Sequence, residues 1–161
     1  MRIASFALAS LLLGLAACAA PTPYQPLGAG GGVAAQQLTA DTFRILARGN
    51  GVTDPAAVED YMLLKAAETT LAAGGTHFVL VTTTDATATS TTQGPTEIRT
   101  VVQGDTSVTT VDPGQSFTFV APGRDAIIRV VTVRPGATPP EGAFDAAEIV
   151  AFVAPRVARP Q

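Results

Sequence analysis

Residues 42–82, TFRILARGNGVTDPAAVEDYMLLKAAETTLAAGGTHFVLVT, decide the fold of this chain of 161 residues. The first seven alternate, and this alternation is typical of a half-buried strand. One face of that strand would carry Phe43, Ile45 and Ala47. The turn-forming residues Gly49-Asn50-Gly51 then end it, because Asn and Gly accept positive φ at little cost.

A helix and a second strand follow within the same stretch. Asp54 is a favourable N-cap, and Pro55 suits the first helical position because its missing N–H is not needed there. Gly74-Gly75 indicates the C-terminal end of the helix. The apolar run 77–83 is typical of a central strand. This order predicts a βαβ-like unit, with strands 42–48 and 77–83 side by side and the helix across one face.

One face of the predicted helix carries a carboxylate among apolar residues. That face comprises Ala57, Tyr61, Leu64, Leu71 and Ala72, with Glu68 in its middle and Thr70 pointing away. Burial of a carboxylate is costly unless the group is paired. We therefore interpret Glu68 as half of a structural ion pair with Arg44 or Arg48, with Arg99 as a further available cation. A general acid/base role for Glu68 is the less favoured alternative.

Turn signals divide the second half of the chain. The Thr-rich run 82–93 suits an exposed strand because it has few large apolar residues. Gly104-Asp105 is typical of a type II′ hairpin turn, and Asp112-Pro113-Gly114 and Pro122-Gly123 mark two more turns. We therefore expect a four-stranded meander over residues 96–134.

The sequence indicates an α+β fold with one main helix packed on a mostly antiparallel sheet. It begins with the βαβ-like unit, continues with the β-meander and ends with a short helix at residues 143–153, for which Asp145 is the candidate N-cap. We expect a single domain over residues 38–154 and a loose tail over residues 155–161.

The N-terminus has the layout of a secretory signal. Arg2 supplies a positive charge, and the apolar run that follows is too short to cross a hydrocarbon core, which needs about 20 residues. Leu15-Ala16-Ala17-Cys18 resembles a bacterial lipobox. The resemblance implies a signal peptide over residues 1–17, cleavage between Ala17 and Cys18, and fatty acylation of Cys18 on its sulfur and new amino group. Cleavage by another signal peptidase, or an uncleaved anchor, is the alternative.

The residues after Cys18 predict a flexible tether over positions 18–37. Prolines stiffen its first part, glycines loosen its second, and it has no apolar periodicity. Residue 19 is Ala rather than Asp, which favours the outer membrane, facing the periplasm, over retention in the inner membrane. The expected location is therefore the bacterial cell envelope, with attachment to the membrane through acylated Cys18.

Composition excludes several classes of partner. Removal of Arg2 with the signal peptide leaves nine basic and thirteen acidic residues, a net charge of −4. Without a basic block, nucleic acid is not an expected partner. The chain has no Trp and two Tyr, too few aromatic residues for a stacking platform for bases or sugars.

No catalytic, metal or cofactor site is expected. His77 is the only histidine, so a zinc site or a Ser-His-Asp arrangement would have to be built on it. We interpret it instead as a residue at the rim of the sheet. The glycines at positions 28–32 follow no strand and do not form a phosphate loop.

Several short segments resemble a known family. They are Phe43-Arg44, Arg48-Gly49-Asn50, Val58-Glu59-Asp60-Tyr61, Leu63 to Glu68, Gly74-Gly75, Phe78-Val79 and Ala143 to Val150. In these segments the chain resembles the Caulobacter-type family of small bacterial envelope lipoproteins of unknown function. The resemblance implies a lipobox and an envelope location, and supplies no catalytic residues. The Thr-rich middle departs from the Gly/Tyr-rich insertion common in that family.

Three functions follow as hypotheses. The first is a non-enzymatic, lipid-anchored envelope protein with a structural or protein-binding role, whose exposed strands accept an envelope partner. The second is a small-ligand or cell-wall-binding lipoprotein with a concave apolar pocket. The third, a hydrolase, needs a nucleophile–base pair that the sequence does not supply.

Overall fold

The structure, a computed structural model, describes residues 20–160. The predicted cleavage site at Ala17 and Cys18, and the lipidation site Cys18, lie outside the described residues. The chain divides into two compact units: unit 1 contains the residues up to Thr87 and from Ala121, and unit 2 is Ala88–Val120. Unit 2 lies within the single domain expected over 38–154, and its described side chains enter no core.

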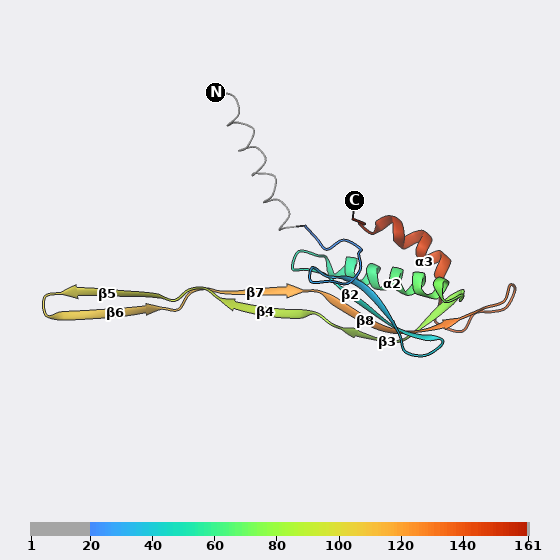
Figure 1. Cartoon of the computed structure of the whole chain (residues 1–161), viewed down its shortest axis with the longest axis horizontal. Helices are drawn as coiled ribbons and strands as arrows, with labels where there is room; N and C mark the ends of the chain where they lie inside the picture. Colours follow the sequence, from blue (N-terminus) through green and yellow to red (C-terminus); the bar gives the residue numbers. More distant parts are fainter. Residues whose placement is uncertain (1–19, 161) are drawn as a thin grey trace, which may run out of the picture. The chain divides into compact units, whose positions relative to one another are not determined.

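Unit 1 contains a five-stranded antiparallel sheet with one face covered by a helix (Figure 1). The strand order is β1 (Gly32–Gln37), β2 (Thr42–Arg48), β8 (Gly123–Val131), β3 (His77–Asp85) and β9 (Ala143–Asp145). Helix α2 (Pro55–Ala72) packs on this sheet, and the short helix α3 (Ala146–Val153) packs on α2. The predicted α+β class, with one main helix on a mostly antiparallel sheet and a short C-terminal helix, is confirmed.

The core forms where β2 and β8 present their inward faces to α2. Phe43, Ile45 and Ala47 are buried as the alternation predicted. In the register between β2 and β8, Ile45 lies opposite Ala126 and Phe43 opposite Ile128, so both strands bury residues on the same face.

Strand β8 occupies the place between β2 and β3, so the prediction that strands 42–48 and 77–83 are neighbours is wrong. The apolar run that we assigned to the end of a meander pairs on both sides in the main sheet instead. It can do so because β8 is apolar enough to be a central strand, with Ile128 fully buried. The remaining strands form two separate two-stranded ladders, so the four-stranded meander over 96–134 is also wrong.

Helix α2 begins as predicted but buries a different face near its end. Asp54 is the N-cap, and its side chain accepts a hydrogen bond from the Ala56 N–H. Thr70, expected to point away, is buried, and Leu71, expected to be buried, is exposed. Burial of Thr70 is inexpensive because its hydroxyl donates to the Ala66 carbonyl at 2.8 Å, which leaves no unpaired polar group.

Residues 20–37 are folded, so the predicted flexible tether is wrong from Ala20 onward. Tyr24 is only 7% exposed, and its ring meets the Tyr61 ring edge-on at 5.7 Å. The Val33 N–H donates to the Gln25 carbonyl at 2.8 Å, and β1 pairs along the whole of β2. We call residues 20–31 the N-terminal strap. A single aromatic anchor and pairing with the neighbouring strand β2 order this segment without any local periodicity.

The strap is also joined to the loop that precedes α2. The Asn50 side-chain amide donates to the Ala20 carbonyl at 2.8 Å. The Thr22 N–H donates to the Thr53 hydroxyl at 2.9 Å, and the Tyr61 hydroxyl donates to the Thr22 carbonyl at 2.8 Å. The described chain is therefore tied to unit 1 from its first residue, Ala20.

The C-terminal segment packs as well, so the expectation of a loose tail over 155–161 is wrong for residues 156–159. The Asp145 side chain caps α3 as predicted, accepting from the N–H groups of Ala147 and Glu148. After the short 3₁₀ helix η3 (Ala154–Arg156), Val157 is buried, and the Tyr24 N–H donates to the Ala158 carbonyl at 2.7 Å. The two ends of the described chain are thus held together on α2.

The packing of the N-terminal strap can be tested with Tyr24→Ala. Loss of a buried aromatic ring typically costs about 3–5 kcal/mol, so we expect a decrease of that size in the free energy of unfolding, measured by urea titration. Leu27→Ala, at an exposed strap position, is the control and should change it by less than about 0.5 kcal/mol. Equal, small effects of both substitutions would show that the strap is not packed.

Candidate functional site

Glu68 lies in a polar cluster formed by three distant parts of the chain. One carboxylate oxygen accepts a hydrogen bond from the Tyr24 hydroxyl at 2.7 Å. The other lies 3.1 Å from the Arg159 guanidinium, which also stands over the Tyr24 ring at 5.2 Å from its centre. The carboxylate is therefore paired, as expected for a charged group at the edge of the core.

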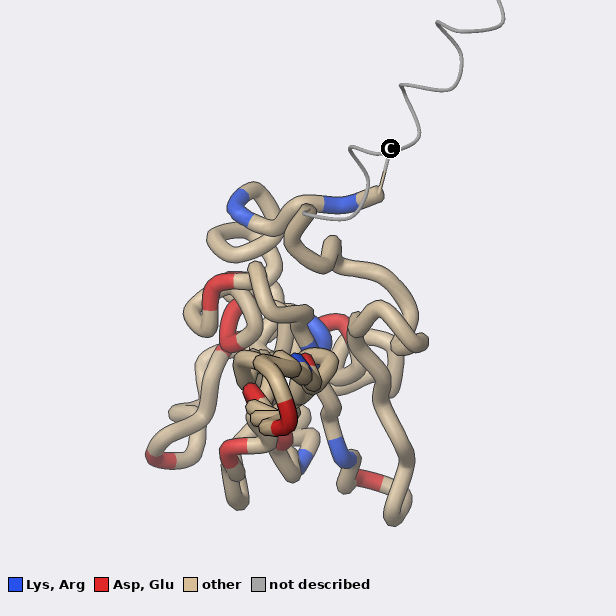
Figure 2. The backbone as a smooth tube through the Cα atoms, turned by 90° about the vertical axis from the view of Figure 1, so that its left-hand side faces the viewer, with Lys and Arg blue, Asp and Glu red and all other residues tan. Residues whose placement is uncertain are grey.

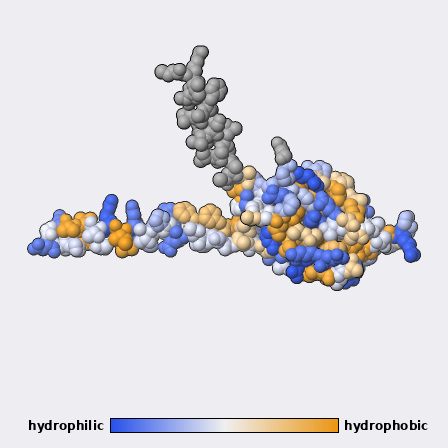
Figure 3. Space-filling view, viewed as in Figure 1, coloured by the Kyte–Doolittle hydropathy of each residue, from blue (hydrophilic) through white to orange (hydrophobic). Residues whose placement is uncertain are grey.

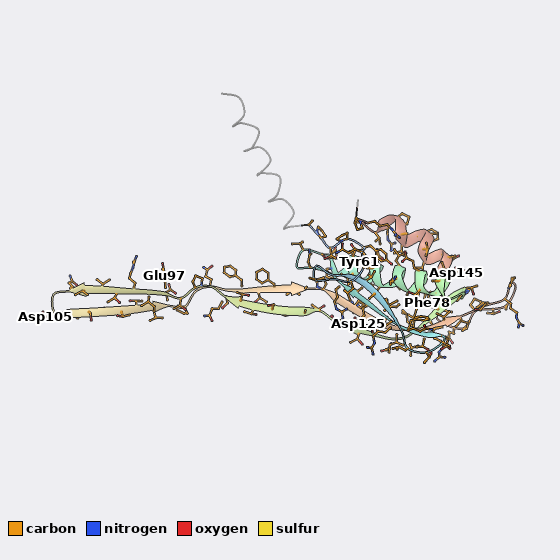
Figure 4. All side chains as sticks on the ribbon, viewed as in Figure 1. Tyr61, Phe78, Glu97, Asp105, Asp125 and Asp145 are labelled. Atoms are coloured by element: carbon orange, nitrogen blue, oxygen red, sulfur yellow. The ribbon has the colours of Figure 1, made fainter. Side chains whose placement is uncertain are left out.

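The cation partner of Glu68 is Arg159, and the predicted partners Arg44 and Arg48 are wrong. Alternation along β2 turns Phe43 and Ile45 toward α2, so Arg44 and Arg48 lie on the opposite face of the sheet. There Arg48 forms an ion pair with Asp125 on β8, and Figure 4 labels Asp125. The sequence did not indicate Arg159 because it lies in the segment taken for a loose tail.

The surroundings of Tyr24 favour its role as a hydrogen-bond donor to Glu68. Burial raises the pKa of Tyr24 above its ordinary value, and the carboxylate of Glu68 raises it further. Tyr24 therefore stays a neutral hydrogen-bond donor at physiological pH. Two hollows lie beside the cluster, of about 540 and 560 Å³, and Lys65 contributes to both. Both are open to solvent.

His77 lies at the rim of the sheet, at the start of β3. Its Nε2 is 3.8 Å from a carboxylate oxygen of Asp145, and its Nδ1 is 2.9 Å from the Thr76 hydroxyl. Within residues 20–160, no group of three His, Cys, Asp or Glu side chains is arranged to hold a metal ion.

Unit 2, which we call the Thr-rich hairpin, is the most unusual surface of the described chain. Strand β4 (Ala88–Gln93) pairs with β7 (Ser116–Ala121), and β5 (Glu97–Gln103) pairs with β6 (Thr106–Asp112). Every residue of β5 and β6 is exposed. Gly104 has a φ of +63° and Asp105 does not have a positive φ, which confirms the predicted type II′ turn.

The two faces of the β5–β6 ladder differ in chemistry. One face is uncharged, and its cross-strand pairs are Ile98–Val111, Thr100–Thr109 and Val102–Ser107. The two threonine hydroxyls are 3.0 Å apart. The other face carries Glu97 opposite Asp112, with Arg99 two residues along the strand from Glu97. Figure 4 shows Glu97 on β5 and Asp105 at the turn.

The β4–β7 ladder adds two aromatic side chains. The hydroxyls of Thr91 and Thr118 lie 3.3 Å apart, so these residues share one face. Alternation places Phe117 and Phe119 together on the other face, and both are exposed. Orange patches in Figure 3 mark hydrophobic side chains at the surface of this hairpin.

These features identify the Thr-rich hairpin as the candidate functional site. An isolated two-stranded hairpin is at best marginally stable in water, and its unpaired strand edges are templates for further pairing. Its eight large exposed apolar side chains are Ile98, Val101, Val102, Val108, Val111, Phe117, Phe119 and Val120. Its charges are few, and Figure 2 shows acidic and basic residues interspersed along the whole described backbone rather than gathered into a block. Such a surface suits a protein partner.

No family model, no curated protein and no solved structure matches the chain. Across residues 20–160, no helix has the length and apolar character needed to cross a membrane.

Arg159→Gln tests the identity of the cation that pairs with Glu68. Glu68 and Arg159 side chains are 32% and 54% exposed, so the ion pair and the cation–π contact together should contribute only about 1–2 kcal/mol. We expect thermal unfolding to show a loss of that size for Arg159→Gln and no change for Arg44→Gln. A larger loss for Arg44→Gln would contradict the arrangement.

Proposed function

We propose that this protein is a lipid-anchored component of the bacterial cell envelope that binds another protein through its Thr-rich hairpin and catalyses no reaction. The observation that carries the proposal is the hairpin itself, whose apolar strands are exposed on both faces and along open edges. A partner would cover these side chains and complete the backbone hydrogen bonding of the edges.

The anchor in this proposal is acylated Cys18. Leu15-Ala16-Ala17-Cys18 closes the apolar N-terminal run, and no described helix is long and apolar enough to cross a membrane. Because Cys18 is the only cysteine, its acylation would leave the mature protein without a free thiol. We place the protein in the outer membrane, facing the periplasm.

Protein binding is better supported than small-ligand or cell-wall binding. The hollows beside Lys65 are open and of mixed polarity, whereas small-molecule sites are usually enclosed and mainly apolar. Several charged groups have structural partners: Asp54 and Asp145 cap helices, and Glu68, Asp60 and Asp125 form ion pairs with arginines. These arrangements support a non-enzymatic role.

The anchor is tested by Cys18→Ser. We expect the unsubstituted protein to remain with outer-membrane fractions after a high-salt wash, and mass spectrometry to find fatty acids on an N-terminal Cys18. The Cys18→Ser protein should be absent from the salt-washed membranes. An unsubstituted mature terminus that carries no fatty acid would overturn the anchor.

The binding surface is tested by a photoreactive residue placed at Val102. Irradiation of envelopes should give a defined cross-linked protein, and the Ile98→Ser/Val111→Ser variant should lose this product. Both side chains are exposed, so these changes should alter the free energy of unfolding by only about 0.5 kcal/mol each. Leu71→Ser, at an exposed apolar position of α2, should keep the product, and its loss there would contradict a hairpin-specific surface.

A further inference from the structure

We propose that the protein bound by the Thr-rich hairpin is a second copy of this chain, with the β5 strands of the two copies paired antiparallel about a two-fold axis at Thr100. This inference rests on the proposed function, since it identifies the partner of the same surface. It follows from the direction of the backbone groups along β5 and from the order of side chains in that strand.

The tight turn determines which backbone groups of β5 are unpaired. The Gly104-Asp105 turn is closed by the pair Gln103–Thr106, and the β-turn hydrogen bond runs between those two residues. Along an antiparallel ladder, hydrogen-bonded and non-hydrogen-bonded pairs alternate. The N–H and C=O groups of Val102, Thr100 and Ile98 therefore point away from β6, toward the open edge.

Pairing about Thr100 engages every outward-pointing N–H and C=O group of β5. Each strand faces its copy over all seven residues, with Glu97 opposite Gln103 of the second copy, Ile98 opposite Val102 and Arg99 opposite Val101. The outward groups of Ile98, Thr100 and Val102 meet each other and form about six hydrogen bonds between the copies. Ile98–Val102 occurs twice, and such β-branched pairs stabilise a sheet.

The neighbouring registers are disfavoured by charge. A register centred on residue 99 places Arg99 opposite its own copy, and one centred on residue 101 places Glu97 opposite Asp105. Registers that lie between these place a residue whose N–H and C=O point to the open edge opposite a residue whose groups point toward β6. The hydrogen bonds between the copies then cannot form. In the register centred on Thr100, the two Arg99 side chains are diagonal neighbours, and each has Glu97 beside it on its own strand.

The open edge of β6 is less suited to pairing with β6 of a second copy. Its symmetric register, centred on Thr109, would place Ser107 opposite Val111 and Thr106 opposite Asp112, so no pair joins two apolar side chains. The β5 pairing instead forms a four-stranded sheet, which exceeds the three strands that independent stability requires. Ile98, Val102 and Val111 of both copies then form one continuous uncharged face.

Two matched cysteine variants test the axis. Both are made in the mature chain, residues 18–161, with Cys18→Ser, which contains every described residue and carries no other thiol. Paired Thr100 residues would have Cα atoms about 5.5 Å apart, within disulfide range, whereas the Thr109 residues would be separated by three strand spacings, about 14 Å. Mild oxidation should therefore cross-link Thr100→Cys into a dimer and leave Thr109→Cys monomeric.

Two proline variants test the edge without a cross-link. Thr100→Pro and Thr109→Pro each remove one N–H that points away from the hairpin ladder, from β5 and β6 respectively. Light scattering across a dilution series should find dimers for Cys18→Ser alone and with Thr109→Pro, and monomers with Thr100→Pro.

Three outcomes would overturn the inference: a monomer at every concentration, equal cross-linking at positions 100 and 109, or dimers that survive Thr100→Pro. Photocross-linking from Val102 to a different envelope protein, lost with Ile98→Ser/Val111→Ser, would leave the proposed binding function standing while excluding the second copy as the partner. These solution measurements use protein that carries no lipid. Absence of the membrane anchor therefore cannot be mistaken for absence of the dimer.

Discussion

Burial of one face of α2 against the sheet is the constraint on which the rest of unit 1 depends. Strands β2, β8 and β3 supply the inward apolar side chains, and the ends of the described chain close over the helix from outside. Tyr24 from the strap and Arg159 from the C-terminal segment meet at Glu68. The carboxylate is thus the point at which three segments far apart in the sequence are joined.

The two units differ in how much of their apolar surface they bury. Unit 1 buries large side chains such as Phe78 and Ile128 completely, while unit 2 leaves its valines, isoleucine and phenylalanines exposed. Threonine explains how the hairpin tolerates this exposure, because its β-branched side chain favours the strand and its hydroxyl interacts with water. The hydroxyls of Thr100 and Thr109 also interact with each other across the two strands. A strand ladder of this composition remains extended while it offers apolar area to a partner.

Locally encoded features were predictable from the sequence. The N-caps at Asp54 and Asp145, the alternation in β2 and the type II′ turn at Gly104 each depend on a few neighbouring residues. The insertion of β8 between β2 and β3 was not predictable in this way, because it depends on pairing between residues 39 to 87 positions apart in the sequence. The partner of Glu68 was missed for the same reason, since Arg159 reaches it only after the C-terminal segment docks.

The bond between Asn50 and the Ala20 carbonyl has a consequence for how far the protein can reach. Only Ala19 separates Ala20 from Cys18, and two residues span at most about 7 Å. If fatty acids on Cys18 enter the leaflet, almost no chain separates unit 1 from the membrane anchor. Its loop at Asn50 would rest near the lipid head groups, and the protein would search for partners by lateral diffusion along the membrane rather than by swinging into the periplasm.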